Sequence, residues 1–309
     1  MWKWTLRILG ALLVIIALAV IVSVALYQHW LTGHERDLRS SSAVIQTASG
    51  PIEYAEIGTG PAVLVSHGTP GGYDGPLAVL KLTHAEGRGF RYIIPSRPGY
   101  LRTSITVGRT PEQQADAFAA LLDSLHIQKA AIIGQSGGGP SALQFALRHP
   151  RRCSALVLES ALVRNYSGPA PRLPQTAFGA YVTNLLFYVF QDAGLAPYQT
   201  QNPNDPLITP LVRAELYGVM PYWPRRVGTE NDLVQEQRLN GWPLDKITCP
   251  TLILQGTADQ SAPPADAEYA HAQIAGSALV ELTGADHMMS DISHKKVDDL
   301  ITTFLRQHP

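Results

Sequence analysis

Short apolar runs alternate with amphipathic segments along most of the chain. Continuous apolar runs bounded by turn residues predict buried strands, whereas apolar positions three and four residues apart predict helices. The clearest helix start is Thr110-Pro111-Glu112-Gln113, which has the form of a capping box. We expect strands at 52–56, 61–65, 90–95, 130–134, 155–159, 251–255 and 278–282, and helices from Thr110 through 125, at 137–148, at 265–274 and up to 306.

This alternation predicts an α/β fold. Strands separated by single helical segments indicate βαβ units and a mostly parallel central sheet with helices on both faces. The rhythm breaks between residues 163 and 246, in a stretch rich in Pro, Tyr and Asn. We therefore expect a core built from residues 43–162 and 247–309, with an inserted helical cap at 163–246.

One segment of the expected cap, residues 177–190, is strongly apolar. Tyr181, Leu185 and Tyr188 fall at helical spacing within it, which predicts a stripe on one helix face. Packing within a lid is the favoured interpretation of this stripe. Lining of a substrate channel comes second, and contact with a membrane comes third.

The N-terminus has the composition of a membrane span. The chain is almost purely apolar from Ile8 to Leu26, and at about 1.5 Å per residue such a helix nearly crosses a hydrocarbon core of about 30 Å. Lys3 and Arg7 precede the apolar run. Because positive charge stays on the cytoplasmic side, residues 1–27 are expected to anchor a catalytic domain that lies outside the cytoplasm.

A cleaved signal peptide is the alternative. Ser23-Val24-Ala25 places small residues at the spacing of a cleavage site, and cleavage there would yield a secreted or periplasmic protein. In both cases residues 28–42, which are polar and rich in Ser, Arg and His, are expected to form a linker.

Charge and cysteine content narrow the function classes. The 309 residues include 24 Lys and Arg against 25 Asp and Glu, so no long-range field favours a nucleic-acid partner. Cys153 and Cys249 each precede an apolar run, and their thiols lie close together if those strands are neighbours. Two buried, unpaired cysteines are the favoured reading. Neither has metal-ligand spacing, and we expect no metal and no organic cofactor.

The segment Gly134-Gln135-Ser136-Gly137-Gly138 joins a predicted strand to a predicted helix almost without a loop. This is the G-x-S-x-G pattern of a nucleophile elbow, in which the serine projects beyond the end of its strand. Residues two before and two after must be small, because the helix passes close to the strand. Taken alone, five residues of this pattern also fit an ordinary glycine-rich turn.

A serine nucleophile needs a base, and the base needs an orienting acid. Asp259 and His287 each follow a predicted strand, and they complete the chain order of serine, acid and histidine. We predict that Ser136, Asp259 and His287 form a catalytic triad.

Each member of this triad has a rival. Glu159, at the end of the preceding strand, is the alternative acid, and His294, within an expected helix, is the alternative base. Asp259 also fits a turn or helix-cap role, and His287 also fits a hydrogen-bonded loop histidine. Asp286 is expected to cap a loop or to be solvated.

A tetrahedral intermediate also needs donors for its oxyanion. The N–H of Gly137 is expected to supply one donor, and the N–H of Thr69, in the loop His67-Gly68-Thr69-Pro70-Gly71-Gly72, the other. His67 is expected to hold the loop. Gly68, Gln135 and Tyr100 are expected to contact substrate.

Together the segments HGTPGG, SRPGY, GQSGGG, LILQGTAD and GADH resemble the α/β-hydrolase superfamily, in matching order from Ile52 to Phe304. The resemblance implies the fold, the catalytic machinery and a helical cap, but no particular substrate. Ser136 argues against the families that use an aspartate nucleophile. The HGTPG loop resembles the HGxPG loop of proline iminopeptidases and carbon–carbon bond hydrolases more than the HGGG loop of many lipases. The GGSWG elbow of the iminopeptidases is absent. In SRPGY, Ser96 replaces the aspartate that is commoner at this position.

The expected function is hydrolysis of a small acyl ester through an acyl-enzyme, as in carboxylesterases. The alternative is peptidase or amidase action of the iminopeptidase type, for which Glu215, Glu230 and Asp232 are candidates to bind an ammonium group. A non-catalytic binding module is a third reading, but such proteins usually lack a triad member.

Overall fold

A mostly parallel sheet organises the computed structural model, which describes residues 2–166, 168, 173–199 and 203–309. In the described residues eight strands follow the order β1-β2-β4-β3-β5-β6-β7-β8. The pairs β1–β2 and β2–β4 are antiparallel, and the remaining pairs are parallel. The predicted α/β class is therefore confirmed. The strands are β1 (Ala43–Thr47), β2 (Gly50–Gly58), β3 (Ala62–Ser66), β4 (Arg91–Pro95), β5 (Ala130–Gln135), β6 (Cys153–Glu159), β7 (Thr251–Gly256) and β8 (Ala278–Leu282).

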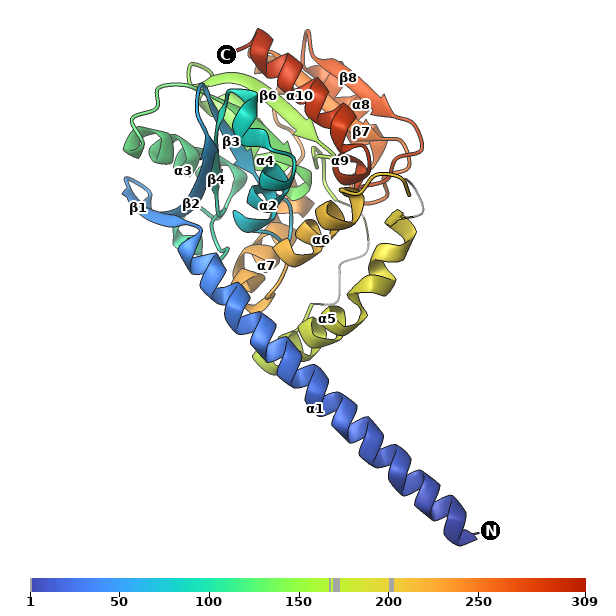
Figure 1. Ribbon diagram of the computed structural model, residues 1–309. Helices are drawn as coiled ribbons and strands as arrows, with labels where there is room; N and C mark the ends of the chain where they lie inside the picture. The colour runs from blue at the N-terminus through green and yellow to red at the C-terminus, as the bar shows by residue number, and fades with distance from the viewer. Residues whose placement is uncertain (1, 167, 169–172, 200–202) are drawn as a thin grey trace.

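Helices cover both faces of the sheet (Figure 1). Ile132 of β5 packs with Phe118 in one buried cluster, and its neighbour Ile133 packs with Ile301 in the other. Successive side chains of a strand point to opposite faces, which is why the inner strands are apolar throughout. The first face carries α3 (Pro111–Ser124), α4 (Gly139–Arg148) and α8 (Pro264–Gln273), and the second carries α2 (Asp74–Leu82), α9 (Met289–Ile292) and α10 (His294–Gln307).

Local signals account for most of these elements. The Thr110 hydroxyl accepts a hydrogen bond from the Gln113 amide, and the Gln113 side chain accepts one from the Thr110 amide, as a capping box requires. The sequence pattern does not predict β1, a half-exposed strand at the sheet edge, or α2, a short helix that contains Gly75-Pro76. Single turns lie at Ala85–Arg88, Ile105–Val107, Ser136–Gly138, Trp223–Arg225, Glu236–Arg238 and Leu244–Lys246.

Three helices lie between β6 and β7 in the chain: α5 (Ala177–Gln199), α6 (Ile208–Gly218) and α7 (Arg226–Gln235). Helix α6 packs against α2, and α5 joins α6 to the N-terminal helix (Figure 1). Within the expected cap, 163–246, residues 167, 169–172 and 200–202 lie outside the described part of the chain, as does residue 1 of the expected anchor.

The first helix, α1 (Trp2–Ser40), is much longer than its apolar stretch. Residues 28–40, expected as a linker, continue the helix because one of its faces is buried against the cap. Tyr27 is 0 % exposed and lies edge-on to Tyr181, with ring centroids 5.1 Å apart, while Trp30 contacts Tyr188 and Tyr217. Two residues of the expected stripe, Tyr181 and Tyr188, thus pack against α1.

The preceding part of α1 is exposed, apolar and long enough to cross a membrane. A signal sequence near the N-terminus has the same properties.

The two cysteines lie side by side. Strands β6 and β7 are parallel neighbours, and this pairing brings the sulfur atoms of Cys153 and Cys249 to 3.5 Å from one another. Both are free thiols.

Candidate active site

Ser136 occupies a strained turn at the end of β5. Its φ of 48° lies in the left-handed region, which few residues other than glycine adopt. A Cβ on Gly134 would lie 2.7 Å from the Cβ of Ala142, and one on Gly138 would collide with the Ser66 carbonyl. The close passage of helix and strand therefore requires glycine at both positions, as the elbow pattern predicts.

Three side chains from distant segments meet at this end of the sheet. The His287 Nε2 atom lies 3.0 Å from the Ser136 hydroxyl oxygen, and Nδ1 lies 2.8 Å from Oδ2 of Asp259. A carboxylate only accepts hydrogen bonds, so Nδ1–H donates to Asp259 and Nε2 is left to accept from Ser136. The structure thus brings together the three residues that the sequence predicts as a triad.

The surroundings of Asp259 keep it ionised. Burial disfavours its charged form, but hydrogen bonds from His287 and from the Ala262 and Ser261 amides outweigh burial and lower its pKa. The Gln255 side-chain amide donates a further hydrogen bond to Oδ2 of Asp259, which helps to fix the carboxylate against the imidazole.

The rival residues have other partners. His294, at the start of α10, is paired with Asp205 at 3.1 Å and does not line the Ser136 cavity. Asp286 accepts a hydrogen bond from the Met288 amide and so caps the turn after His287. Glu159 does line the cavity, but its carboxylate is hydrogen-bonded to Ser290 and Gln135 rather than to the imidazole.

The loop after β3 reaches the elbow. A Cβ on Gly68 would lie 3.2 Å from that of Ser136, and a Cβ on Gly137 would collide with the Thr69 hydroxyl. The two segments expected to supply the oxyanion donors, Thr69 and Gly137, are therefore in direct contact beside the hydroxyl of Ser136.

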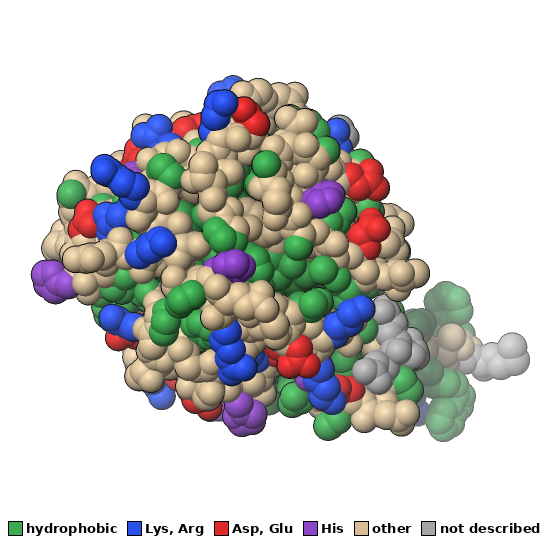
Figure 2. All heavy atoms as spheres, turned by 90° about the horizontal axis from the view of Figure 1, so that it is seen from above, with side chains coloured by type: hydrophobic (Ala, Val, Ile, Leu, Met, Phe, Trp, Pro, Cys, Tyr) green, Lys and Arg blue, Asp and Glu red, His purple; other side chains and the backbone are tan. Residues whose placement is uncertain are grey.

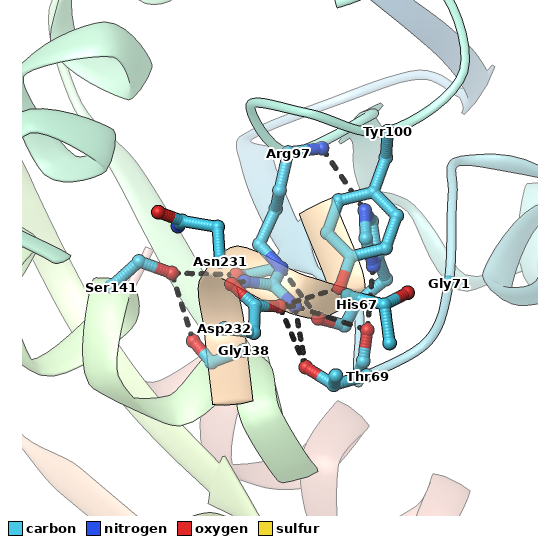
Figure 3. A network of polar contacts seen from close by, with 12 residues as sticks. His67, Thr69, Gly71, Arg97, Tyr100, Gly138, Ser141, Asn231 and Asp232 are labelled. Carbon is cyan, nitrogen blue, oxygen red and sulfur yellow. Dashed lines mark hydrogen bonds and ion pairs between the residues drawn. The ribbon is translucent and has the colours of Figure 1, made fainter. Parts of the chain in front are cut away.

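A buried polar network holds this loop from behind (Figure 3). The Arg97 guanidinium donates to the Asp232 carboxylate at 2.6 Å and to the Thr69 hydroxyl at 3.0 Å, and it also donates to the Gly68 carbonyl. The Thr69 hydroxyl in turn donates to Asp232 at 2.7 Å. A cap residue thereby fixes the loop that carries an expected oxyanion donor.

Two sequence expectations are corrected by this network. Tyr100, expected to contact substrate, is fully buried and donates its hydroxyl hydrogen to Asp232 at 2.6 Å; it does not line the cavity. Asp232, considered as an ammonium ligand, is already neutralised by Arg97. Both side chains serve the network because SRPGY folds back against α7, a contact that no local pattern reports.

His67 has the structural role expected of it. Its Nε2 accepts a hydrogen bond from the Arg97 amide at 3.0 Å, and its Nδ1 lies 2.8 Å from the Gly68 carbonyl. Burial and the neighbouring Arg97 hold its pKa well below the usual value. The ring is therefore neutral, which suits an acceptor at Nε2 and a donor at Nδ1.

A cavity of about 220 Å³ opens at Ser136 and His287. Gly68 and Gln135, both expected to contact substrate, line it. Glu215 also lines it, whereas Glu230 is paired with Arg226 one turn away and lies elsewhere.

The remaining lining includes two further acids, Glu159 and Asp291. Glu159 follows a predicted strand at the same sheet edge as Ser136, a signal that identified it as a rival acid. Asp291 carries no signal in the sequence.

These features together define the class of α/β hydrolases. They are an open, mostly parallel sheet, a serine elbow with a histidine and an aspartate at the carboxyl edge of that sheet, and helices inserted after β6. The sequence model of the α/β hydrolase fold matches residues 61–292, more than half of the chain. The chain belongs to the α/β hydrolase fold family.

The relatives of the chain are hydrolases. It is 27 % identical over 256 residues to the uncharacterized hydrolase YcgS of Bacillus subtilis, covering 78 % of this chain and 89 % of that protein. It is 33 % identical over 112 residues to a 2-hydroxy-6-oxo-6-phenylhexa-2,4-dienoate hydrolase of Comamonas testosteroni, covering 35 % and 38 % of the two chains.

Solved structures show the same fold. An α/β hydrolase fold protein from Nakamurella multipartita is 33 % identical and superposes with a TM-score of 0.76, covering 86 % of this chain and 99 % of its own. A thermophilic esterase from Thermogutta terrifontis, at 24 % identity and a TM-score of 0.62, covers 87 % and 99 % and shares the fold.

Proposed function

We propose that this hydrolase cleaves carboxylic esters of small molecules through Ser136, His287 and Asp259. The observation that carries the proposal is the unbroken chain of contacts, 3.0 Å from serine oxygen to imidazole and 2.8 Å from imidazole to carboxylate. These separations fall within the range needed for proton transfer by a positioned base.

The reaction is a two-step acyl transfer. His287 takes the proton of the Ser136 hydroxyl as the oxygen attacks the ester carbonyl, and Asp259 stabilises the imidazolium that forms. The imidazolium then protonates the leaving alkoxide, which departs as an alcohol. A water molecule activated by His287 attacks the acyl-enzyme and releases the acid and free Ser136.

The oxyanion of each tetrahedral intermediate requires donors placed in advance. We assign this role to the backbone N–H groups of Thr69 and Gly137, whose segments touch beside Ser136. Loss of one such donor typically lowers kcat by about 10²–10³. The Arg97–Asp232 pair supports the Thr69 side of this arrangement.

The decisive experiment uses the full chain in detergent micelles. Purified protein is tested against p-nitrophenyl esters of graded acyl length and against aminoacyl arylamides, with Ser136→Ala as the blank. Turnover should fall by several orders of magnitude in this variant, and a fluorophosphonate probe should label only the unmodified protein. Folded protein that neither turns over esters nor reacts with the probe would support a non-catalytic binding module.

Amidase or aminopeptidase action is the second candidate. The observation that favours it is the position of Glu215 in the cavity, where a carboxylate suits an amino group. Cleavage of arylamides but not of esters in the same screen would favour this candidate.

We further propose that the exposed apolar part of α1 anchors the protein in a membrane, with the catalytic domain outside the cytoplasm. Lys3 and Arg7, which precede the apolar stretch of α1, support this orientation. Figure 2 shows side chains of both charge signs dispersed over the globular part of the molecule. Membrane fractionation and the N-terminal sequence of the mature protein test anchoring against cleavage.

A further inference from the structure

Three acidic side chains face the cavity beside Ser136. Glu159 comes from the end of β6, Glu215 from α6 and Asp291 from α9. Sheet, cap and the segment after His287 each contribute one carboxyl group, so the cluster exists only in the folded chain.

Close packing of α6 on α2 brings Glu215 to this position. A Cβ on Gly218 would lie 2.7 Å from the Cα of Gly75, so the two helices approach to backbone contact. Glu215 lies one turn before Gly218 on the same face of α6, and its carboxylate therefore reaches over Gly75 into the cavity.

No arginine or lysine among the described residues is hydrogen-bonded or ion-paired with these three acids, and the positive charge of a protonated His287 offsets only part of the effect of burial on Glu159 and Glu215. Asp291 is 3 % exposed, and its Oδ1 has no hydrogen-bond partner in the described part of the chain. The Glu215 carboxylate likewise has no hydrogen-bond or ion-pair partner among the described residues. Glu159 accepts hydrogen bonds from the Ser290 hydroxyl and from the Gln135 side-chain amide, and both of these donors are neutral.

Nearby basic side chains are committed to other acids. Arg225 holds Asp74 through two contacts of 2.8 Å. Arg88 forms a bidentate ion pair with Asp298. Neither arginine is available to the three cavity acids.

This arrangement is costly without a ligand. Burial raises the pKa of Glu159 and of Glu215 to about 7, and burial together with Glu215 and Glu159 raises that of Asp291 well above its usual value. A bound cation would reverse the penalty, because an opposite charge favours the ionised carboxylates.

We propose that Glu159, Glu215 and Asp291 form a subsite for a primary ammonium group carried by the substrate. An ammonium offers three N–H donors and no acceptor, and carboxylate oxygens accept, so its three donors match three acidic groups and its positive charge favours their ionised form. The inference rests on the proposed serine hydrolase function, because the cation and the scissile carbonyl share one small cavity.

Matched ester pairs test the proposal in the full chain. The p-nitrophenyl esters of 6-aminohexanoate and heptanoate differ only in an ammonium for a methyl group, and those of β-alanine and butyrate form a shorter pair. We expect kcat/KM to favour the amino ester of at least one pair by about tenfold or more, as for hydrogen bonds to charged groups. If kcat/KM for the neutral ester equals or exceeds that for the amino ester in both pairs, the subsite proposal is wrong.

Variants locate the preference. Glu215→Gln and Asp291→Asn should each reduce the ratio of amino-ester to neutral-ester kcat/KM by about tenfold, whereas Glu281→Gln, at an exposed position of β8, should keep it. If the acids act only on the His287 imidazolium, both esters slow equally and the ratio does not change, which contradicts the proposal.

A binding measurement separates this proposal from the proposed function. Butylammonium chloride, compared with sodium chloride at equal ionic strength, should raise the Tm of the unmodified protein and of Ser136→Ala, but not of Glu215→Gln/Asp291→Asn. A protein that binds butylammonium without labelling by fluorophosphonate retains the subsite and loses the hydrolase proposal. Absence of a Tm difference together with absence of an amino-ester preference would refute the subsite alone.

Discussion

Asp232, on a helix of the cap, holds Arg97 of the core in a buried ion pair with a 2.6 Å contact between Oδ2 and Nη2. The two side chains are 3 % and 1 % exposed. Both also contact the Thr69 hydroxyl, so the loop beside Ser136 is held jointly by core and cap. The cap therefore helps to position the Thr69 loop, rather than only covering a site that the core forms by itself.

Removing this carboxylate charge should lower both stability and turnover. Asp232→Asn leaves the Arg97 guanidinium buried without its counter-ion, which typically costs about 3–5 kcal/mol. Because the Thr69 loop then loses its support, kcat should fall about tenfold or more, with a smaller change in KM. Thermal unfolding and steady-state kinetics measure the two effects. The matched control is Glu230→Gln on the same helix, whose exposed pair with Arg226 contributes little.

Substitution can distinguish the proposed triad acid, Asp259, from its rival, Glu159. Asp259→Asn should reduce kcat on a neutral ester by about 10⁴, because the amide no longer holds the imidazole in the required tautomer. Glu159→Gln should lower it far less, since Glu159 contacts Ser290 and Gln135 instead. The opposite order of effects would assign the orienting role to Glu159.

The cavity acids should make stability depend on pH. Glu159 is 6 % exposed and has its pKa raised from 4.5 to about 7, so between these values the folded protein retains a proton that the unfolded chain has lost. Stability contributed by this group therefore falls as pH rises through the window, by about 3 kcal/mol when complete.

Glu159→Gln should remove the part of this pH dependence that Glu159 contributes, and it should raise the Tm more at pH 8 than at pH 5. Scanning calorimetry of the full chain at pH 5 and pH 8 measures this difference in Tm, and Glu281→Gln, at an exposed position, is the control. An unchanged difference in Tm between the two pH values would contradict the prediction.

The two thiols should form a disulfide under oxidising conditions. Their sulfur atoms are 3.5 Å apart, and oxidised glutathione accepts the two electrons and protons as the bond forms. The bond would close a loop of about 96 residues, for which the chain-entropy model gives a stabilisation of about 4–5 kcal/mol. Thiol counts in denaturant before and after oxidation measure the reaction, and Cys249→Ser is the control. Two reactive thiols after prolonged oxidation would show that the strands hold them apart.

The buried end of α1 should stabilise the cap. Tyr27→Ala removes a ring that is 0 % exposed between Trp30 and Tyr181, and such truncations cost about 3–5 kcal/mol. The adjacent Leu26→Ala, at a residue that is 55 % exposed, should change stability by less than about 0.5 kcal/mol. Thermal unfolding and limited proteolysis of the cap compare the two. Equal behaviour of both variants would mean that α1 and the cap are energetically independent.

Much of the architecture and the meeting of the three triad candidates follow from local sequence. Strand and helix positions depend on periodicities within about ten residues, and the elbow depends on glycines two residues from Ser136. The chain order of Ser136, Asp259 and His287 places them at strand ends, which parallel pairing brings to one edge. The sequence alone therefore predicts the fold class and the composition of the central site.

Only the tertiary structure shows what surrounds that centre. Arg97 contacts Asp232, which lies 135 residues away in the chain. Helix α1 continues past its apolar stretch because Tyr27 packs against Tyr181 of α5. Asp291 lines the same cavity as Glu159 and Glu215. Such contacts depend on how whole helices and strands pack together. The sequence around a polar residue does not show whether its side chain contacts water, an arginine or a ligand. Burial decides among these, and burial is a property of the folded chain.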